Sequence, residues 1–194
     1  MLRRTVLASA LALVSAGAFA APITYKLDPT HTDVLFTWNH LGFSNPTGHF
    51  GQIEGTLVYD EADPTRSSVE ATLPLAGLDT HVTKLDEHLK KDEFLDAAKY
   101  PTITFKSTKV ETAGSGKLKV TGDLTLRGVT KPVVLDVKLN GAGPHPMKKV
   151  PAIGFDATTT IKRSEFGIGA YVPNISDELK VSITTEALGP KPAG

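Results

Sequence analysis

Two groups of histidine and acidic residues are the parts of this sequence whose side chains could perform chemistry. The first joins His81 to Asp86-Glu87-His88, around the stretch TKLDEHLKKDEFLDAAKYPTITFKS (residues 83–107). A zinc helix of the H-E-x-x-H type needs two His four residues apart on one face. His81 and His88 are seven apart, roughly 10 Å along a helix axis. The spacing therefore favours a solvated acidic edge with one half-buried His over a metal or acid–base site.

The second group is His31, His40 and His49, which recur at intervals of nine residues. A hairpin could bring His40 near His49, but two His without a third ligand are a weak basis for a metal site. The chain has no cysteine, which excludes thiolate catalysis and thiolate metal binding. Nucleophile-elbow, P-loop and dinucleotide-binding motifs do not occur either. We expect no catalytic residue, no metal and no cofactor; a metal-dependent enzyme is the weaker alternative.

The N-terminus has the pattern of an export signal. Arg3 and Arg4 precede a short apolar run, and Ala18-Phe19-Ala20 offers the small residues of a cleavage site. The run is shorter than the about 20 apolar residues that a membrane-spanning helix needs. We predict a signal peptide at residues 1–20, cleavage after Ala20, and a periplasmic protein with no membrane span. Without the two arginines the net charge is −2, so nucleic acid is not an expected partner.

The rest of the chain alternates apolar and polar residues with a period of two, which is typical of antiparallel strands with one buried face. Turn residues separate eight such segments, at 31–41, 51–60, 68–75, 102–107, 116–128, 131–139, 152–161 and 178–186. A sheet of eight strands tends to close or to split.

One helical stripe interrupts this rhythm, formed by His81, Leu85, His88 and Leu89. A single helix cannot cover a sheet face, but it can lie at the mouth of a barrel. We therefore predict an all-β fold, an eight-stranded antiparallel barrel with a short helical insertion, as one domain over residues 21–187 with a tail at 188–194. Such a barrel is either filled by its own side chains or holds one small ligand.

Four longer motifs resemble the YceI-like family of periplasmic polyisoprenoid-binding proteins. They are LDPTHTDVLFTWNHLGFSNPTGHF, LDEHLKKDEFLDAAKYPTITFKS, VTGDLTLRGVTKPVVLDV and GFDATTTIKRSEFGIG, the last followed by SDELKVSITTEA. The resemblance covers residues 23–187. It implies a lipocalin-like barrel that binds and sequesters or carries a long-chain isoprenoid lipid, of the quinone or polyprenyl phosphate type, in an internal hydrophobic tunnel.

The resemblance and the alternation together give a set of expected lipid-binding residues: Phe36, Trp38, His40, Phe43, Phe50, Leu85, His88, Leu89, Phe94, Leu95, Phe105, Phe155, Phe166 and Ile168. Leu85 stands where family members commonly carry Arg, so the resemblance does not extend to either role of such an Arg, holding a polar head group or fixing the helix. The alternative is a stress or partner-binding barrel without lipid. The sequence leaves both a monomer and a homodimer open.

The leader pattern gives a direct prediction. Intact-mass measurement of the exported protein should find Ala21 as its first residue, because Ala18 and Ala20 fit a signal peptidase. A mature protein that retains residue 1 would overturn the predicted localisation.

Overall fold

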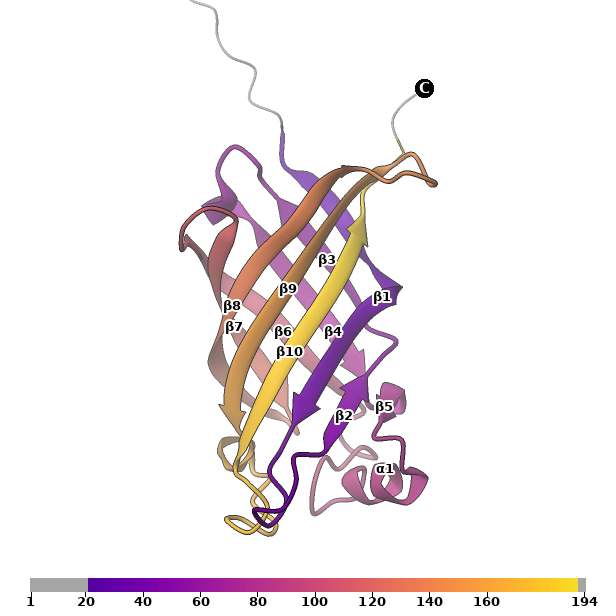
Figure 1. Cartoon of the computed structure of the whole chain (residues 1–194), viewed down its shortest axis with the longest axis vertical. Helices are drawn as coiled ribbons and strands as arrows, with labels where there is room; N and C mark the ends of the chain where they lie inside the picture. Colours follow the sequence, from indigo (N-terminus) through magenta and orange to yellow (C-terminus); the bar gives the residue numbers. More distant parts are fainter. Residues whose placement is uncertain (1–20, 192–194) are drawn as a thin grey trace, which may run out of the picture.

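Eight antiparallel strands close into one barrel in the computed structural model, which describes residues 21–191 (Figure 1). Neighbours along the chain pair with each other, and the last strand returns to pair with the first, which confirms the predicted fold class. The strands are β1 (Ile23–Thr37), β3 (Glu54–Tyr59), β4 (Ser68–Pro74), β6 (Thr102–Thr112), β7 (Lys117–Leu126), β8 (Val129–Pro144), β9 (Pro151–Lys162) and β10 (Glu178–Leu188). The predicted signal peptide lies outside the described residues.

A small annex widens one end of this barrel. It consists of β2 (Thr47–Phe50), β5 (Leu78–Asp79) and α1 (Thr83–Leu89). The first half of β1 pairs with β3, whereas its second half pairs with β2, and β2 in turn pairs with β5. Short 3-10 turns complete the fold at Pro64–Arg66, Leu75–Gly77 and Arg163–Phe166. The alternating pattern of the sequence did not predict β2 or β5, and it predicted a start of β1 at His31 instead of Ile23.

The sequence pattern did not predict the first half of β1, because the strand is irregular between its two halves. The register of β1 against β10 shifts between Leu27 and Thr32, and the residues in between form a bulge at Asp28-Pro29. This bulge interrupts the alternation and lets β1 change partners. Between β2 and β3, the Gly51 amide donates to the Gly77 carbonyl at 3.0 Å. A side chain at Gly77 would collide with the Gly51 backbone, so glycine permits this close approach.

Helix α1 is seven residues long and begins after Val82, without a side-chain cap from that residue. Asp86 instead ties the helix to the preceding segment, since its Oδ1 accepts from the Thr80 amide at 2.8 Å and from the Thr80 hydroxyl at 2.7 Å. His81 lies in the turn before the helix with φ of +61°. The predicted helical stripe is therefore wrong for His81, because the turn and its hydrogen bond to Asp79 direct this residue to solvent. No helix among residues 21–191 is long and apolar enough to span a membrane.

The interior divides into two clusters along the barrel axis. The plug cluster fills the end at which β1 begins and β10 ends (Figure 1), and its buried members are Tyr25, Leu57, Val110, Leu118, Val120, Ile153, Phe155 and Ala187. The cavity cluster lies in the other half and contains Val34, Phe50, Ile53, Leu73, Leu75, Leu78, Phe94, Ile103, Leu126, Phe166 and Ile168. At the plugged end, β10 continues to Leu188 and the Gly189 amide donates to the Pro151 carbonyl at 2.7 Å, so strand pairing extends into the predicted tail.

Asp28 holds the β1 bulge at this plugged end. It is 7% exposed, accepts from the amide and hydroxyl of Thr30 at 3.0 and 2.6 Å, and pairs with Lys148 at 3.0 Å. The hydrogen bond from the Thr30 hydroxyl is the main reason that the pKa of Asp28 lies well below its usual range. The carboxylate therefore stabilises the fold at neutral pH, and this contribution is lost as the pH falls below the unfolded pKa of about 3.9.

We expect Asp28→Asn to lower the free energy of unfolding by about 1.5–3 kcal/mol at pH 7. The difference from the parent should shrink as the pH falls from about 5 to 2, because the Asp28 carboxylate of the unfolded parent then takes up a proton while that of the folded parent stays ionised. Urea unfolding across this range measures both. Asp136→Asn is the matched control, since Asp136 forms an exposed pair with Lys119 worth at most about 1 kcal/mol. If Asp28→Asn lowers the free energy of unfolding by the same amount at pH 7 and at pH 2, this stabilising role of the carboxylate is contradicted.

Candidate ligand-binding site

A cavity of about 770 Å³ occupies the half of the barrel beside α1. Its aromatic lining consists of Phe36, Trp38, Phe50, Phe94 and Tyr171, and its polar lining of His40, Thr47, Thr80, His88, Arg163 and Asn174. All its other lining residues are aliphatic or proline. Within the described chain, no member of the plug cluster lines the cavity, which is therefore blind at the plugged end.

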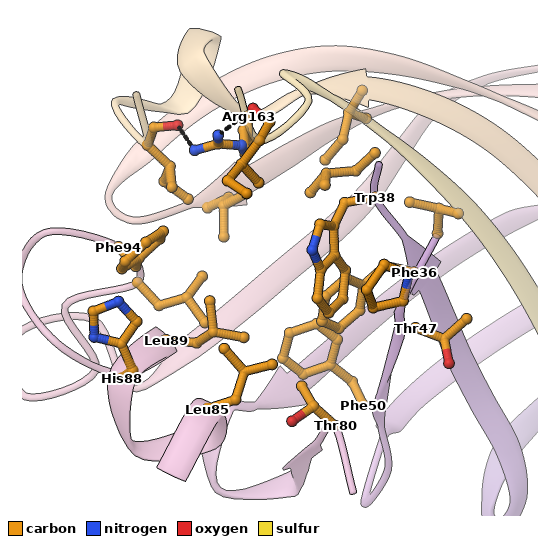
Figure 2. Close-up of a pocket in the computed structure, with 18 of the residues that line it drawn as sticks. Phe36, Trp38, Thr47, Phe50, Thr80, Leu85, His88, Leu89, Phe94 and Arg163 are labelled. Atoms are coloured by element: carbon orange, nitrogen blue, oxygen red, sulfur yellow. Dashed lines mark hydrogen bonds between the residues drawn. The ribbon is translucent and has the colours of Figure 1, made fainter. Parts of the chain in front are cut away.

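Three aromatic rings form a continuous patch of the wall. Phe36 faces inward from β1, and Trp38 follows two residues later, just past the end of that strand. The Phe36 ring stacks on Trp38 with centroids 5.7 Å apart and lies 5.3 Å from Phe50 (Figure 2). Gly48 stands opposite Phe36 in β2, and a side chain there would strike the Phe36 ring. Glycine at this register position therefore makes room for the aromatic wall.

The polar groups near α1 are engaged with protein partners. Thr80 donates to Asp86, as described above, and His88 Nδ1 lies 3.3 Å from Glu93 Oε1. The His88 ring also packs edge-on against Phe94 at 4.9 Å. These contacts fix α1 and the segment after it, so the acidic and His residues of this stretch position the lid of the cavity.

Arg163 is the one lining residue of the described structure with a formal charge. It is 4% exposed, and its Nε, Nη1 and Nη2 donate to the carbonyls of Ser176, Ile168 and Ile175, each at 2.9 Å (Figure 2). Burial lowers the pKa of the guanidinium, while nearby Asp177 acts in the opposite direction. Because all three nitrogens bond to one loop, the side chain braces residues 167–177 at the cavity mouth.

Two contacts join this loop to the segment after α1. Tyr171 stacks on Phe94 with centroids 6.1 Å apart, across the mouth of the cavity. Farther out, Arg127 donates to the Gly167 carbonyl and to the Asp92 carbonyl, both at 2.6 Å. The mouth is thus bordered by parts that hydrogen bonds and ring contacts hold together.

The structure places ten of the expected residues on the cavity wall: Phe36, Trp38, His40, Phe50, Leu85, His88, Leu89, Phe94, Leu95 and Ile168. Four expected residues do not line it. Phe43 is 90% exposed, Phe166 is fully buried behind the wall, and Phe105 and Phe155 belong to the plugged half. Alternation predicts which face of a strand a residue occupies, but it does not predict the height along the barrel axis.

The His residues are distributed over separate places. His40 forms β-bridges with Ser44 and Ile175, while His49 Nδ1 bonds to Asp33 at 3.0 Å, so the hairpin does not unite the His pair as one site. His49 lies near His81, with ring centroids 5.6 Å apart. In the part of the chain that the structure describes, no three His, Cys, Asp or Glu side chains converge to hold a metal ion.

The loop before β10 and the 3-10 turn that precedes it contribute one side of the cavity, of which the sequence predicted only Ile168. The residues it did not predict are Arg163, Tyr171, Asn174 and Ile175. This segment has no strand alternation, so periodicity gave no reason to place it inside. One feature of the sequence could have indicated that this segment contacts the interior, because residues 167–176 contain no Asp, Glu, Lys or Arg.

Comparison with known proteins agrees with this geometry. The YceI-like domain family matches residues 25–187. Protein YceI of Escherichia coli O6:H1 is 40% identical over 181 residues, covering 92% of this chain and 93% of that protein. The crystal structure of the Campylobacter jejuni YCEI protein superposes with a TM-score of 0.72 at 32% identity, covering 79% of this chain and 90% of that one.

A more distant likeness shows the same fold. A polyisoprenoid binding domain from Saccharophagus degradans superposes with a TM-score of 0.64 at 16% identity, covering 87% of this chain and 99% of that domain. The family match and the E. coli relative both extend over most of the sequence. The chain therefore belongs to the YceI-like family.

Proposed function

We propose that this protein binds a long-chain isoprenoid lipid in the cavity and sequesters or carries it in the periplasm. The observation that supports this most directly is the shape of the interior, an apolar cavity that opens at one end and stops at the plug cluster. A blind apolar site suits a ligand that inserts a hydrocarbon tail. The polyisoprenoid binding domain from Saccharophagus degradans, which shares the fold, agrees with this class of ligand.

The size of the cavity sets how much of a tail it holds. If each non-hydrogen atom takes the ~30 Å³ of a liquid water, a five-carbon prenyl unit fills about 150 Å³. The 770 Å³ cavity then accommodates about five units. Burying one unit contributes about 3–4 kcal/mol before the cost of ordering the chain. A few enclosed units are therefore enough to keep the lipid out of water.

The cavity is closed at the plug cluster and open at the mouth, and this difference sets the direction in which a lipid enters. A polar head group would lose hydration at the blind end without gaining a partner there. The tail therefore enters first, and the head group remains at the mouth, near the loops that Arg163 and Arg127 hold. For a tail longer than about five units, the remaining units also lie at the mouth.

We infer a binding protein and not an enzyme. The cavity lining contains neither Asp nor Glu in the described structure, and His88 and Thr80 are engaged with Glu93 and Asp86. His40 is the other lining His, and no acidic residue of the described chain pairs with it to form an acid–base couple. A general acid or base needs a titratable group within hydrogen-bond reach of the substrate. A partner-binding barrel without lipid remains the alternative, and lipid analysis of protein purified from its host separates the two.

Trp38→Ala should reduce the lipid extracted per mole of folded protein, because the ring is part of the aromatic wall. Its stability loss should stay below the ~3–5 kcal/mol usual for a packed aromatic, since one side of the ring faces the cavity. Phe155→Ala is the matched control in the plug cluster: it should cost about 3–5 kcal/mol while the remaining folded protein keeps its lipid. Trp38→Glu should abolish binding by placing an unpaired charge on the wall.

Circular dichroism confirms that each variant is folded before its lipid is extracted. Folded Trp38→Ala and Trp38→Glu proteins with the lipid content of the parent would refute the proposed cavity site. So would a parent protein that carries no lipid and does not bind added isoprenoid quinone.

Tail length provides a second prediction. Trp38 is the single tryptophan of the chain, so quenching of its fluorescence reports occupation of the cavity by an isoprenoid quinone. Among quinones with one to eight prenyl units, affinity should rise with each unit up to about five and then level off, because further units lie outside. Competition titrations measure the series. An affinity that is independent of tail length from the first unit onward would contradict tail insertion.

A further inference from the structure

We propose that the open end of the barrel docks onto the surface of a lipid bilayer through an uncharged tip. The tip consists of residues 38–46, between β1 and β2, and residues 167–176, between the 3-10 turn at Arg163–Phe166 and β10. Both loops lie at the end of the barrel opposite the start of β1 and the end of β10 (Figure 1).

The first observation is the charge composition of the tip. Its two loops read WNHLGFSNP and GIGAYVPNIS and contain no Asp, Glu, Lys or Arg. Charged residues make up 22% of the chain, so about four would be expected in a stretch of this length on base composition alone. His40 is its one basic side chain. The tip can therefore leave water without desolvating an Asp, Glu, Lys or Arg side chain.

The second observation is that the two loops form one hydrogen-bonded unit. The Leu41 amide donates to the Asn174 carbonyl at 3.0 Å, and the Ser176 amide donates to the Asn39 carbonyl at 3.0 Å. The Asn39 amide donates to the Ser176 hydroxyl at 2.8 Å. These backbone groups have partners within the tip, which lowers the cost of placing it in an apolar environment. The loops thus present their side chains from a braced backbone.

The third observation is the exposure of large apolar side chains on this unit. Phe43 is 90% exposed, Tyr171 59%, Leu41 50% and Val172 37%. Val82, at the start of α1, adds a further 53% exposed residue at the mouth. Single exposed apolar residues are ordinary, but a group around one opening marks an interaction surface. Aromatic residues such as Phe43 and Tyr171 suit the boundary between headgroups and acyl chains.

A bilayer is the occupant that this surface fits, because the tip is continuous with the cavity. Leu41, Val82 and Tyr171 are exposed and also line the cavity, so rim and wall form one apolar surface. This step rests on the proposed function: an isoprenoid tail stored in a bilayer could pass into the cavity without crossing water. Each prenyl unit that crossed water instead would cost about 3–4 kcal/mol. An uncharged tip requires no anionic lipid.

The test uses flotation with neutral phosphatidylcholine vesicles that contain no isoprenoid. The exported protein, expected to begin at Ala21, should float with the vesicles. Phe43→Ser should lower its partition coefficient into the vesicles about tenfold, because one inserted aromatic ring is lost. The matched control is Met147→Ser. Met147 is an 83% exposed apolar residue in the β8–β9 turn, at the opposite end of the barrel, and its replacement should leave flotation unchanged.

Four results would overturn the docking surface. One is a parent protein that stays unbound, and a second is a Phe43→Ser variant that floats as well as the parent. A third is binding that requires anionic vesicles and disappears in high salt, which would locate the contact on Lys84 of α1 and on Lys90 and Lys91 after it. The fourth is a parent dimer that Phe43→Ser converts to a monomer in sedimentation, since a second copy would then cover the tip.

Cargo binding is measured separately, by Trp38 quenching with a short-chain isoprenoid quinone in solution. Phe43 does not line the cavity, so Phe43→Ser should bind this quinone as the parent does but take it up from vesicles more slowly. A parent that floats but binds no quinone refutes the proposed cargo and leaves docking in place. A parent that binds quinone but does not float refutes docking alone.

Discussion

The interior volume of a closed eight-stranded barrel is the constraint on which the rest of this structure depends. Strand number sets the width, and the enclosed space must be filled by side chains or by a guest. In this protein the two solutions share one barrel. The plug cluster fills the end where Tyr25 and Ala187 lie, whereas the other half is hollow. One half therefore provides a packed core, and the other is free to bind.

The hollow half begins where β1 changes partners. Beyond the bulge at Asp28, β1 leaves β3 and pairs with β2, and between β2 and β3 the Gly51 amide bonds to the Gly77 carbonyl. The annex of β2, β5 and α1 is thereby inserted into the wall. It enlarges the interior beyond what facing side chains fill and delivers α1 to the mouth. A regular barrel without this annex would leave less room.

The barrel and its inward faces could be predicted because alternation is a local property of the chain. Phe36 and Phe155 both follow that pattern, yet one lines the cavity and the other is packed in the plug. Their difference depends on strand register around the barrel, a non-local quantity that no local pattern contains. His81 was misplaced because a helical spacing cannot reveal a turn with positive φ. Arg163 was missed because its three partners are backbone carbonyls of a loop, which have no side-chain signature.

A hollow half cannot be stabilised by packing, so its borders need other interactions. Arg163 fixes the loop before β10 through three carbonyls, and Arg127 ties that loop to the segment after α1. Directional bonds of this kind hold a shape without filling the space inside it. A ligand that fills the cavity adds the missing contacts and stabilises the folded state by mass action. In the proposed function, the packed end thus supplies a core that does not depend on the ligand, and the braced end supplies the site that the ligand fills.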